Sequence, residues 1–93
     1  MNESQNAVEA LRALDGKLVA LKYTNTWLKT EEFSKEIRTK FHFVETKSEV
    51  GCTIGRYDLL LEKETLKHEV RSREIYFYAS TYPYKTEWII REI

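Results

Sequence analysis

Apolar and polar positions alternate in two runs near the C-terminus, over residues 73–80 and 85–93. Between the runs lies Thr81-Tyr82-Pro83-Tyr84, which contains the only proline of the chain. Alternation with a period of two, in segments rich in aromatic and β-branched residues, is typical of strands joined by a turn. The pattern predicts a hairpin whose first strand has an apolar face and a tyrosine face. The apolar face carries Ile75, Phe77 and Ala79, and the other carries Tyr76, Tyr78 and Ser80.

A helical spacing marks the opposite end of the chain. Val8, Leu11 and Leu14 recur at intervals of three residues and form one apolar stripe. This spacing predicts a helix over residues 3–14. Asn2 or Ser4 is expected to cap its start, and Gly16 supplies the left-handed conformation that ends it.

The middle of the chain predicts further strands. Residues 17–24 form a strand with Val19, Leu21 and Tyr23 on one face, and Asn25-Thr26 is expected to turn. Phe33, Ile37 and Phe41 recur every four residues, as in a helix, but the composition after Glu36 favours a strand from about Glu36 to Lys47. Residues 30–34 are then a turn or one helical turn.

The next segments alternate between turn and strand signals. Ser48 to Gly55 contains two of the three glycines and is expected to be a turn or bulge, followed by a strand over residues 56–63. The charged segment from Glu64 to Ser72 either forms a loop or extends its neighbouring strands into a long hairpin. One helix followed by strands with short connections predicts an α+β fold, with the N-terminal helix packed on a four- to five-stranded, mostly antiparallel meander sheet.

The length and the net charge of the chain argue against several classes of function. The 93 residues suit a single domain, 1–93, that folds without disulfides or metal. Fifteen Lys and Arg balance fifteen Asp and Glu, so the net positive charge that drives nonspecific binding to nucleic acid or anionic lipid is absent. A secretory signal, a membrane span and a disulfide are not expected, which predicts a cytoplasmic protein without membrane partners.

Candidate catalytic and metal-binding residues are few. Cys52 with His42 or His68 is the one nucleophile and base combination to weigh, and its sequence context favours a turn cysteine with two exposed histidines. With one cysteine and two histidines, a four-ligand zinc site is excluded. Acidic pairs such as Glu31-Glu32 are typical of solvated faces. We therefore expect no enzyme activity, no cofactor and no metal site.

Aromatic and basic residues supply the stronger signal. The candidate binding residues are Tyr76, Tyr78, Tyr82, Tyr84 and Trp88 with Arg71 and Arg73, joined by Arg38 and Lys40 from a basic stripe that continues to His42. Tyr and Arg are enriched at the energetic centres of protein interfaces. Exposed aromatic rings beside guanidinium groups also stack on unpaired bases. For any single residue, the competing interpretation is a half-buried cross-strand partner or a charge that keeps an edge soluble.

These features predict a small non-enzymatic binding or regulatory protein that contacts another protein, or a second copy of itself as a homodimer, through an aromatic and basic sheet face. Small inhibitors or accessory proteins encoded by phages and mobile elements share this profile. The alternative is a module that binds single-stranded nucleic acid through Tyr76, Tyr78, Arg71, Arg73 and the Arg38 and Lys40 stripe.

Overall fold

The N-terminal segment folds as its apolar spacing predicts. The computed structural model describes residues 2–27, 35–81 and 84–93, and for residues 25–27, 81 and 84 it describes the backbone alone. Helix α1 spans Glu3–Arg12, and the Asn2 side chain caps it by accepting a hydrogen bond of 2.8 Å from the Gln5 amide. The helix ends at Arg12, two residues before the expected end, with Ala13 as its C-cap, and Gly16 adopts the left-handed φ of +83° in the turn that follows.

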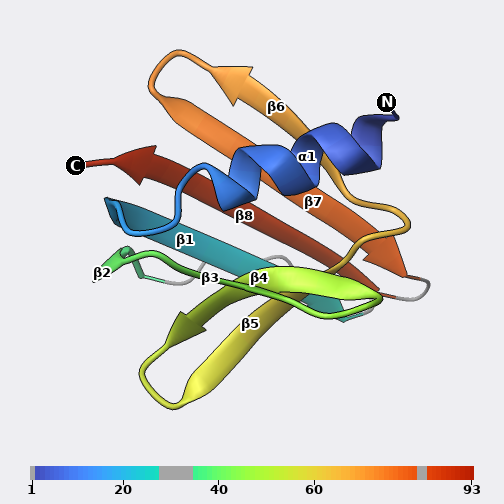
Figure 1. Cartoon of the computed structure of the whole chain (residues 1–93), viewed down its shortest axis with the longest axis horizontal. Helices are drawn as coiled ribbons and strands as arrows, with labels where there is room; N and C mark the ends of the chain where they lie inside the picture. Colours follow the sequence, from blue (N-terminus) through green and yellow to red (C-terminus); the bar gives the residue numbers. More distant parts are fainter. Residues whose placement is uncertain (1, 28–34, 82–83) are drawn as a thin grey trace.

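Among the described residues, eight strands follow the helix in two antiparallel sheets (Figure 1). The large sheet has the order β2-β1-β8-β7-β6, and the small sheet has the order β3-β4-β5. The strands are β1 (Leu18–Trp27), β2 (Ile37–Lys40), β3 (His42–Glu45), β4 (Glu49–Ile54), β5 (Tyr57–Glu62), β6 (Lys67–Arg71), β7 (Glu74–Thr81) and β8 (Tyr84–Glu92). The fold is therefore α+β and mostly sheet, but the expected single meander is wrong.

The division into two sheets arises at Phe41, where the strand expected over residues 36–47 breaks. The Phe41 amide donates to the Lys17 carbonyl at 2.8 Å, and the Phe41 carbonyl accepts from the Gly16 amide at 2.8 Å. The Phe41 ring is fully buried. The chain passes at this residue from β2 in the large sheet to β3 in the small sheet. Asp15 supports the bend, because its carboxylate accepts a hydrogen bond of 3.1 Å from the Phe43 amide.

Two expected turns are strands instead. Asn25 and Thr26 continue β1, where they pair with Thr86 and Lys85 of β8. The segment 49–54 within the expected turn of Ser48 to Gly55 forms β4, the central strand of the small sheet. Tertiary pairing overrides the turn signals here, because β4 finds a partner strand on each side.

The charged segment before the C-terminal hairpin is neither a loop throughout nor an extension of both neighbouring strands, because β5 ends at Glu62 and lies in the small sheet. Residues 67–71 are β6, which pairs with β7 from Lys67↔Tyr78 to Arg71↔Glu74. The predicted hairpin of β7 and β8 is confirmed by pairing from Ile75↔Ile90 to Thr81↔Tyr84. Its turn residues, Tyr82 and Pro83, lie outside the described residues.

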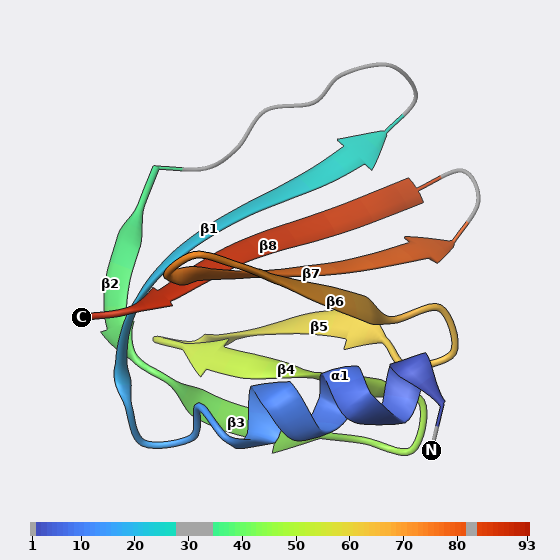
Figure 2. The ribbon, with the colours of Figure 1, turned by 90° about the horizontal axis from the view of Figure 1, so that it is seen from above.

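Helix α1 and the small sheet lie together on one face of the large sheet (Figure 2). The core fills the space between these layers, with Trp88, Phe77 and Ile90 of the large sheet and Leu11 of the helix fully or almost fully buried. The opposite side of the large sheet is named the outer face. It carries the alternate residues, among them Tyr76 and Tyr78 of β7.

Candidate binding surface

The two tyrosines of β7 lie side by side on the outer face. Phe77 and Ala79, between and beside them, are 0% and 5% exposed on the core side, so strand alternation directs Tyr76 and Tyr78 away from the core. Both tyrosines are half-buried, which leaves part of each ring available for contact. The predicted tyrosine face is thus present.

Neighbouring strands surround these rings with charged groups. Tyr76 is paired with Glu69 of β6 and Ile89 of β8, and Tyr78 is paired with Lys67 and Glu87. Arg71 lies over the Tyr76 ring, with its guanidinium carbon 4.6 Å from the ring centroid. This distance is typical of a cation–π contact.

Glu69 holds the arginine in that position. The Arg71 Nη2 donates to Glu69 Oε2 at 2.7 Å, and this hydrogen bond raises the pKa of the Arg71 side chain above its ordinary value. A guanidinium fixed by one carboxylate and one aromatic ring loses less conformational entropy when a partner binds. Arg71 and Tyr76 therefore form a preordered pair.

A shallow hollow of about 350 Å³ lies beside this pair, lined by Glu69, Arg71, Tyr76, Phe77, Tyr78, Lys85 and Glu87. Lys85 Nζ and Glu87 Oε1 are 3.0 Å apart on its β8 side. We name this hollow with its charged border the tyrosine face. It combines aromatic surface with both signs of charge.

Arg38 and Lys40 lie on the same outer face but at its far edge. They belong to β2, and three strand spacings of about 4.8 Å put β2 roughly 14 Å from β7. Their distance from the tyrosines is larger still, because Arg38 is level with Ala20 of β1 whereas Tyr76 is level with Lys22. Glu36 joins this edge to β8 through Arg91 at 2.9 Å, and that hydrogen bond lowers the pKa of the Glu36 carboxyl. The structure thus separates the basic edge from the tyrosine face.

The other candidate residues do not join this surface. Trp88 is 1% exposed and is the cross-strand partner of Phe77, so it belongs to the core. Arg73 is exposed in the turn between β6 and β7. Tyr82 lies outside the described residues, and the side chain of Tyr84 in β8 is not described. His42 falls in the small sheet, which splits the expected basic stripe at Phe41.

Cys52 is a buried strand residue and not the turn residue expected. It is 0% exposed in β4, between Phe43 of β3 and Leu59 of β5, and burial raises the pKa of its thiol to about 12. A thiol with that pKa is protonated near neutral pH and is a poor nucleophile. His68 lies in the other sheet, stacked on Phe77 with ring centroids 5.9 Å apart.

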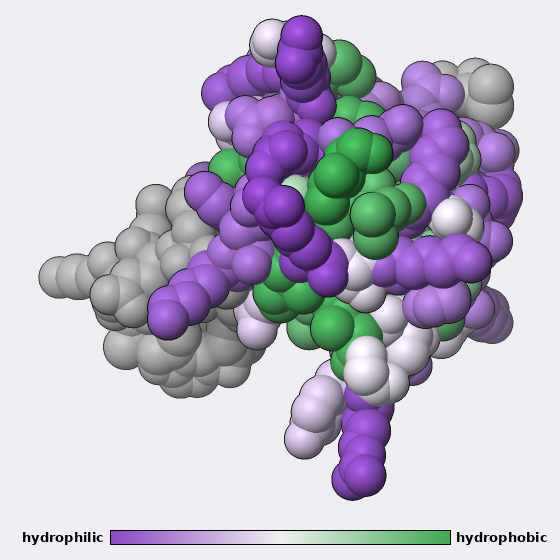
Figure 3. Space-filling model, turned by 90° about the vertical axis from the view of Figure 1, so that its left-hand side faces the viewer, coloured by the Kyte–Doolittle hydropathy of each residue, from purple (hydrophilic) through white to green (hydrophobic). Residues whose placement is uncertain are grey.

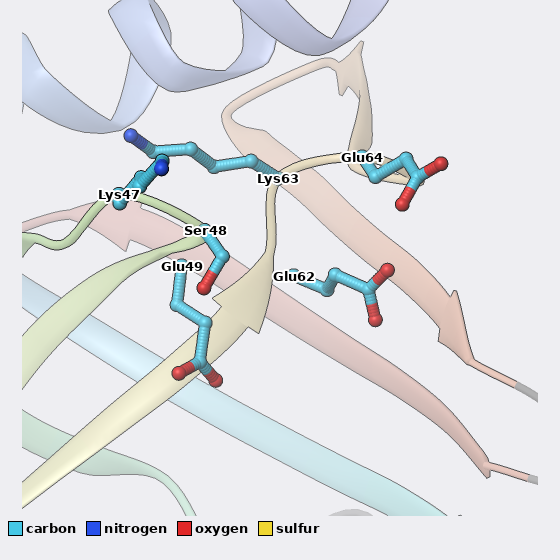
Figure 4. Close-up of a pocket in the computed structure, with 6 residues that line it drawn as sticks. All are labelled: Lys47, Ser48, Glu49, Glu62, Lys63 and Glu64. Atoms are coloured by element: carbon cyan, nitrogen blue, oxygen red, sulfur yellow. The ribbon is translucent and has the colours of Figure 1, made fainter.

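A second hollow, at the end of the small sheet, gathers acidic and basic side chains (Figure 4). Its border is formed by Lys47, Ser48, Glu49, Glu62, Lys63 and Glu64. Glu49 and Glu62 are cross-strand partners, yet their carboxylates point away from each other in Figure 4. Across residues 2–27, 35–81 and 84–93, no group of three or more His, Cys, Asp or Glu side chains is arranged to hold a metal ion.

Comparisons with protein-family models, with curated proteins and with solved structures found no significant match to this chain. Nor did a search of the described residues find a helix of the length and apolar character that crossing a membrane requires. The geometry of the surface is therefore the basis for assigning a function.

The sequence pattern does not predict the acidic residues of the tyrosine face. Glu69 and Glu87 were not singled out, although they flank Tyr76 and Tyr78 directly in the sheet. The alternation of charged residues at 67, 69 and 71 was the available signal, because a strand there places all three on the face of the tyrosines.

Proposed function

We propose that this chain is a non-enzymatic binding protein that contacts another protein through the tyrosine face. The observation that carries the proposal is the Arg71–Tyr76 pair, held at 4.6 Å beside a hollow on an otherwise mixed-charge sheet surface. Preordered aromatic and guanidinium groups are the residue types that contribute most to protein interfaces. A regulatory or inhibitory role in the cytoplasm, as the sequence predicts, is part of the same proposal.

The distribution of charge favours a protein over a nucleic acid. Glu69 and Glu87 each lie opposite one of the two tyrosines, so a phosphate backbone beside the rings would meet two carboxylates. Arg71 and Lys85 are moreover engaged with those same carboxylates at 2.7 and 3.0 Å. A protein partner can offer both signs of charge and satisfy this arrangement.

The test is capture of partners from a lysate of the natural host by the tagged chain, with mass spectrometry of what is retained. The wild-type chain is expected to retain a stoichiometric protein that survives nuclease treatment. Tyr76→Ala and Tyr78→Ala should each weaken its retention about tenfold or more, as is usual for aromatic residues at an interface centre.

Tyr57→Ala is the matched control, because Tyr57 is 76% exposed on the small sheet and the change removes the same atoms from a different surface. Circular dichroism establishes that all variants remain folded. Retention that is equal for the wild-type chain and both outer-face variants would refute the proposal.

Single-stranded nucleic acid remains the second candidate, supported by the surplus of cations on the outer face. Lys22, Arg38, Lys40, Lys67, Arg71, Lys85 and Arg91 outnumber Glu36, Glu69, Glu74 and Glu87 among the described residues there. This function predicts affinity for mixed oligonucleotides that falls as salt rises. Absent or salt-independent binding would exclude it.

A further inference from the structure

A second surface, distinct from the tyrosine face, lies at one end of the large sheet. Three of the four large apolar side chains that are exposed among the described residues lie there: Leu18 and Ile93 at 54% and Val70 at 65%. Leu18 and Ile93 are adjacent, since the Ile93 amide donates to the Leu18 carbonyl at 3.0 Å. Figure 3 looks onto this end and shows apolar side chains gathered near its centre with polar ones around them.

A groove of about 350 Å³ opens at the same end, between the segment that follows α1 and the turn joining β6 to β7. Its apolar lining consists of Leu14, Val70, Ile75 and Ile90, and its border includes Ser72, Arg73, Glu74 and Glu92. Val70 is cross-strand partner to Ile75, which in turn is partner to Ile90, so the lining is one continuous row across three strands. We name this groove the apolar end; Leu18 and Ile93 lie at the same end of the large sheet but alternate to its outer face.

The charges on the border indicate what covers this end. Arg73 and Glu74 are neighbours of opposite sign, and neither forms an ion pair or side-chain hydrogen bond with any described residue. The remaining acidic group of the groove, Glu92, is already paired with Lys17 at 3.0 Å. A surface with one free cation beside one free anion, around an apolar centre, is complementary to itself under a twofold rotation.

We propose that the apolar end joins two copies of this chain about a twofold axis, with Arg73 of each copy against Glu74 of the other. The net charge of zero favours such a contact, because two copies do not repel each other at long range. The exposed Val70 and the half-buried Ile75 supply the apolar centre of the contact, and the two Arg73–Glu74 contacts lie at its border.

Pairing of two copies through the free edge of β6 is a poorer arrangement. An antiparallel register centred on Glu69 aligns the whole of β6, but it puts Glu69 opposite its own copy and Lys67 opposite Arg71. Like charges directly opposite each other destabilise a strand pair. The charges of β6 thus oppose strand pairing between two copies at its free edge, whereas no such repulsion opposes contact at the apolar end.

The test is the self-association of the purified chain, measured by sedimentation equilibrium up to about 1 mM, a range that detects even weak dimers. The wild-type chain is expected to dimerise. Arg73→Glu alone and Glu74→Arg alone should each weaken the dimer about tenfold, because each change replaces two attractive contacts with two repulsive ones.

The double variant Arg73→Glu with Glu74→Arg restores opposite charges across the axis and should recover the wild-type dissociation constant within about threefold. Val70→Asp, at a side chain 65% exposed, should weaken the dimer at least tenfold by placing a charge at the apolar centre. Tyr57→Ala, at a side chain 76% exposed on the small sheet and outside both proposed surfaces, is the control and should leave the dimer unchanged.

Concentration-dependent amide shifts of the wild-type chain give a second readout that needs no variant. Shifts confined to residues 70–75 and 90–93 would support the proposal. A chain that stays monomeric, a dimer insensitive to Val70→Asp, or a double variant as weak as the single ones would overturn it. None of these outcomes depends on the partner of the tyrosine face, so the two proposals fail separately.

Discussion

Gly51 lies where two strands of the small sheet approach too closely for any side chain. A Cβ atom added there would be 1.8 Å from the Leu59 carbonyl oxygen and 2.9 Å from the Leu59 carbonyl carbon. Both atoms belong to the backbone of β5, so they cannot move aside by rotating a side chain. The change Gly51→Ala therefore requires β4 and β5 to separate.

The magnitude follows from what that separation disrupts. Cys52 and Leu61, in the same two strands, are at most 1% exposed, so moving the strands also disturbs the packed core. Overpacking typically costs about 1–3 kcal/mol and more when the backbone must shift. We expect a loss of about 3 kcal/mol or more, which for a domain of this size lowers the melting temperature by roughly 12–24 °C.

Thermal and urea unfolding followed by circular dichroism measure this loss. Gly55→Ala is the control, because its added Cβ would have nothing within 4 Å and only the backbone φ of +61° opposes it. That conformational cost is about 1–2 kcal/mol. If Gly51→Ala proves no more destabilising than Gly55→Ala, the close approach of β4 and β5 is refuted.

Three further predictions concern single side chains. Ser72 has φ of +55° in the β6–β7 turn, so Ser72→Gly should raise the free energy of unfolding by about 1 kcal/mol in urea titrations, and a loss would contradict the strain. Cys52, with a pKa of about 12 and no exposure, should resist iodoacetamide at pH 8 in the folded chain and react in urea; rapid alkylation of the folded chain would contradict its burial. Hydrogen bonds from Lys63 and Arg12 lower the pKa of the Glu45 carboxyl, so its contribution to stability is present above the unfolded pKa and is lost as pH falls through the lower, folded value. Glu45→Gln should accordingly flatten the acid limb of the pH–stability curve, and a wild-type curve that already lacks this dependence would refute the role.

The sequence was sufficient where local pattern and tertiary environment agree. The helix stripe of Val8 and Leu11 is buried as expected, and Asn2 caps the helix start. In the C-terminal hairpin, Phe77 is in the core and Tyr76 is on the outer face, as alternation alone predicts. These elements depend on residues near one another in the chain.

The predictions from sequence are wrong where contacts between residues far apart in the chain determine the local structure. The strand break at Phe41 depends on hydrogen bonds to Gly16 and Lys17, which lie far away in the chain and leave no local signal. Likewise β4 contains a glycine and a cysteine that suggest a turn, but a strand on each side provides the pairing that turns it into sheet. Division into two sheets could not be inferred without those contacts.

The candidate surface was predictable in part for the same reason. Tyr76 and Tyr78 share a face by alternation, whereas the stacking of Arg71 on Tyr76 depends on the register of β6 against β7. Trp88 could not be separated from the tyrosines without knowing that Phe77 is its cross-strand partner. Strand register, and not residue type, determines which aromatic residues meet a partner.

The antiparallel pairing of β1 with β8 has a consequence for biosynthesis. These two strands are adjacent at the centre of the large sheet, from Val19↔Glu92 to Trp27↔Tyr84, although nearly the whole described chain separates them. During translation, the edge of β1 that pairs with β8 remains unpaired until β8 has been synthesised. We therefore expect folding dominated by nonlocal contacts and slow for a chain of this length, with an interval in which the nascent chain depends on chaperones that shield unpaired strands.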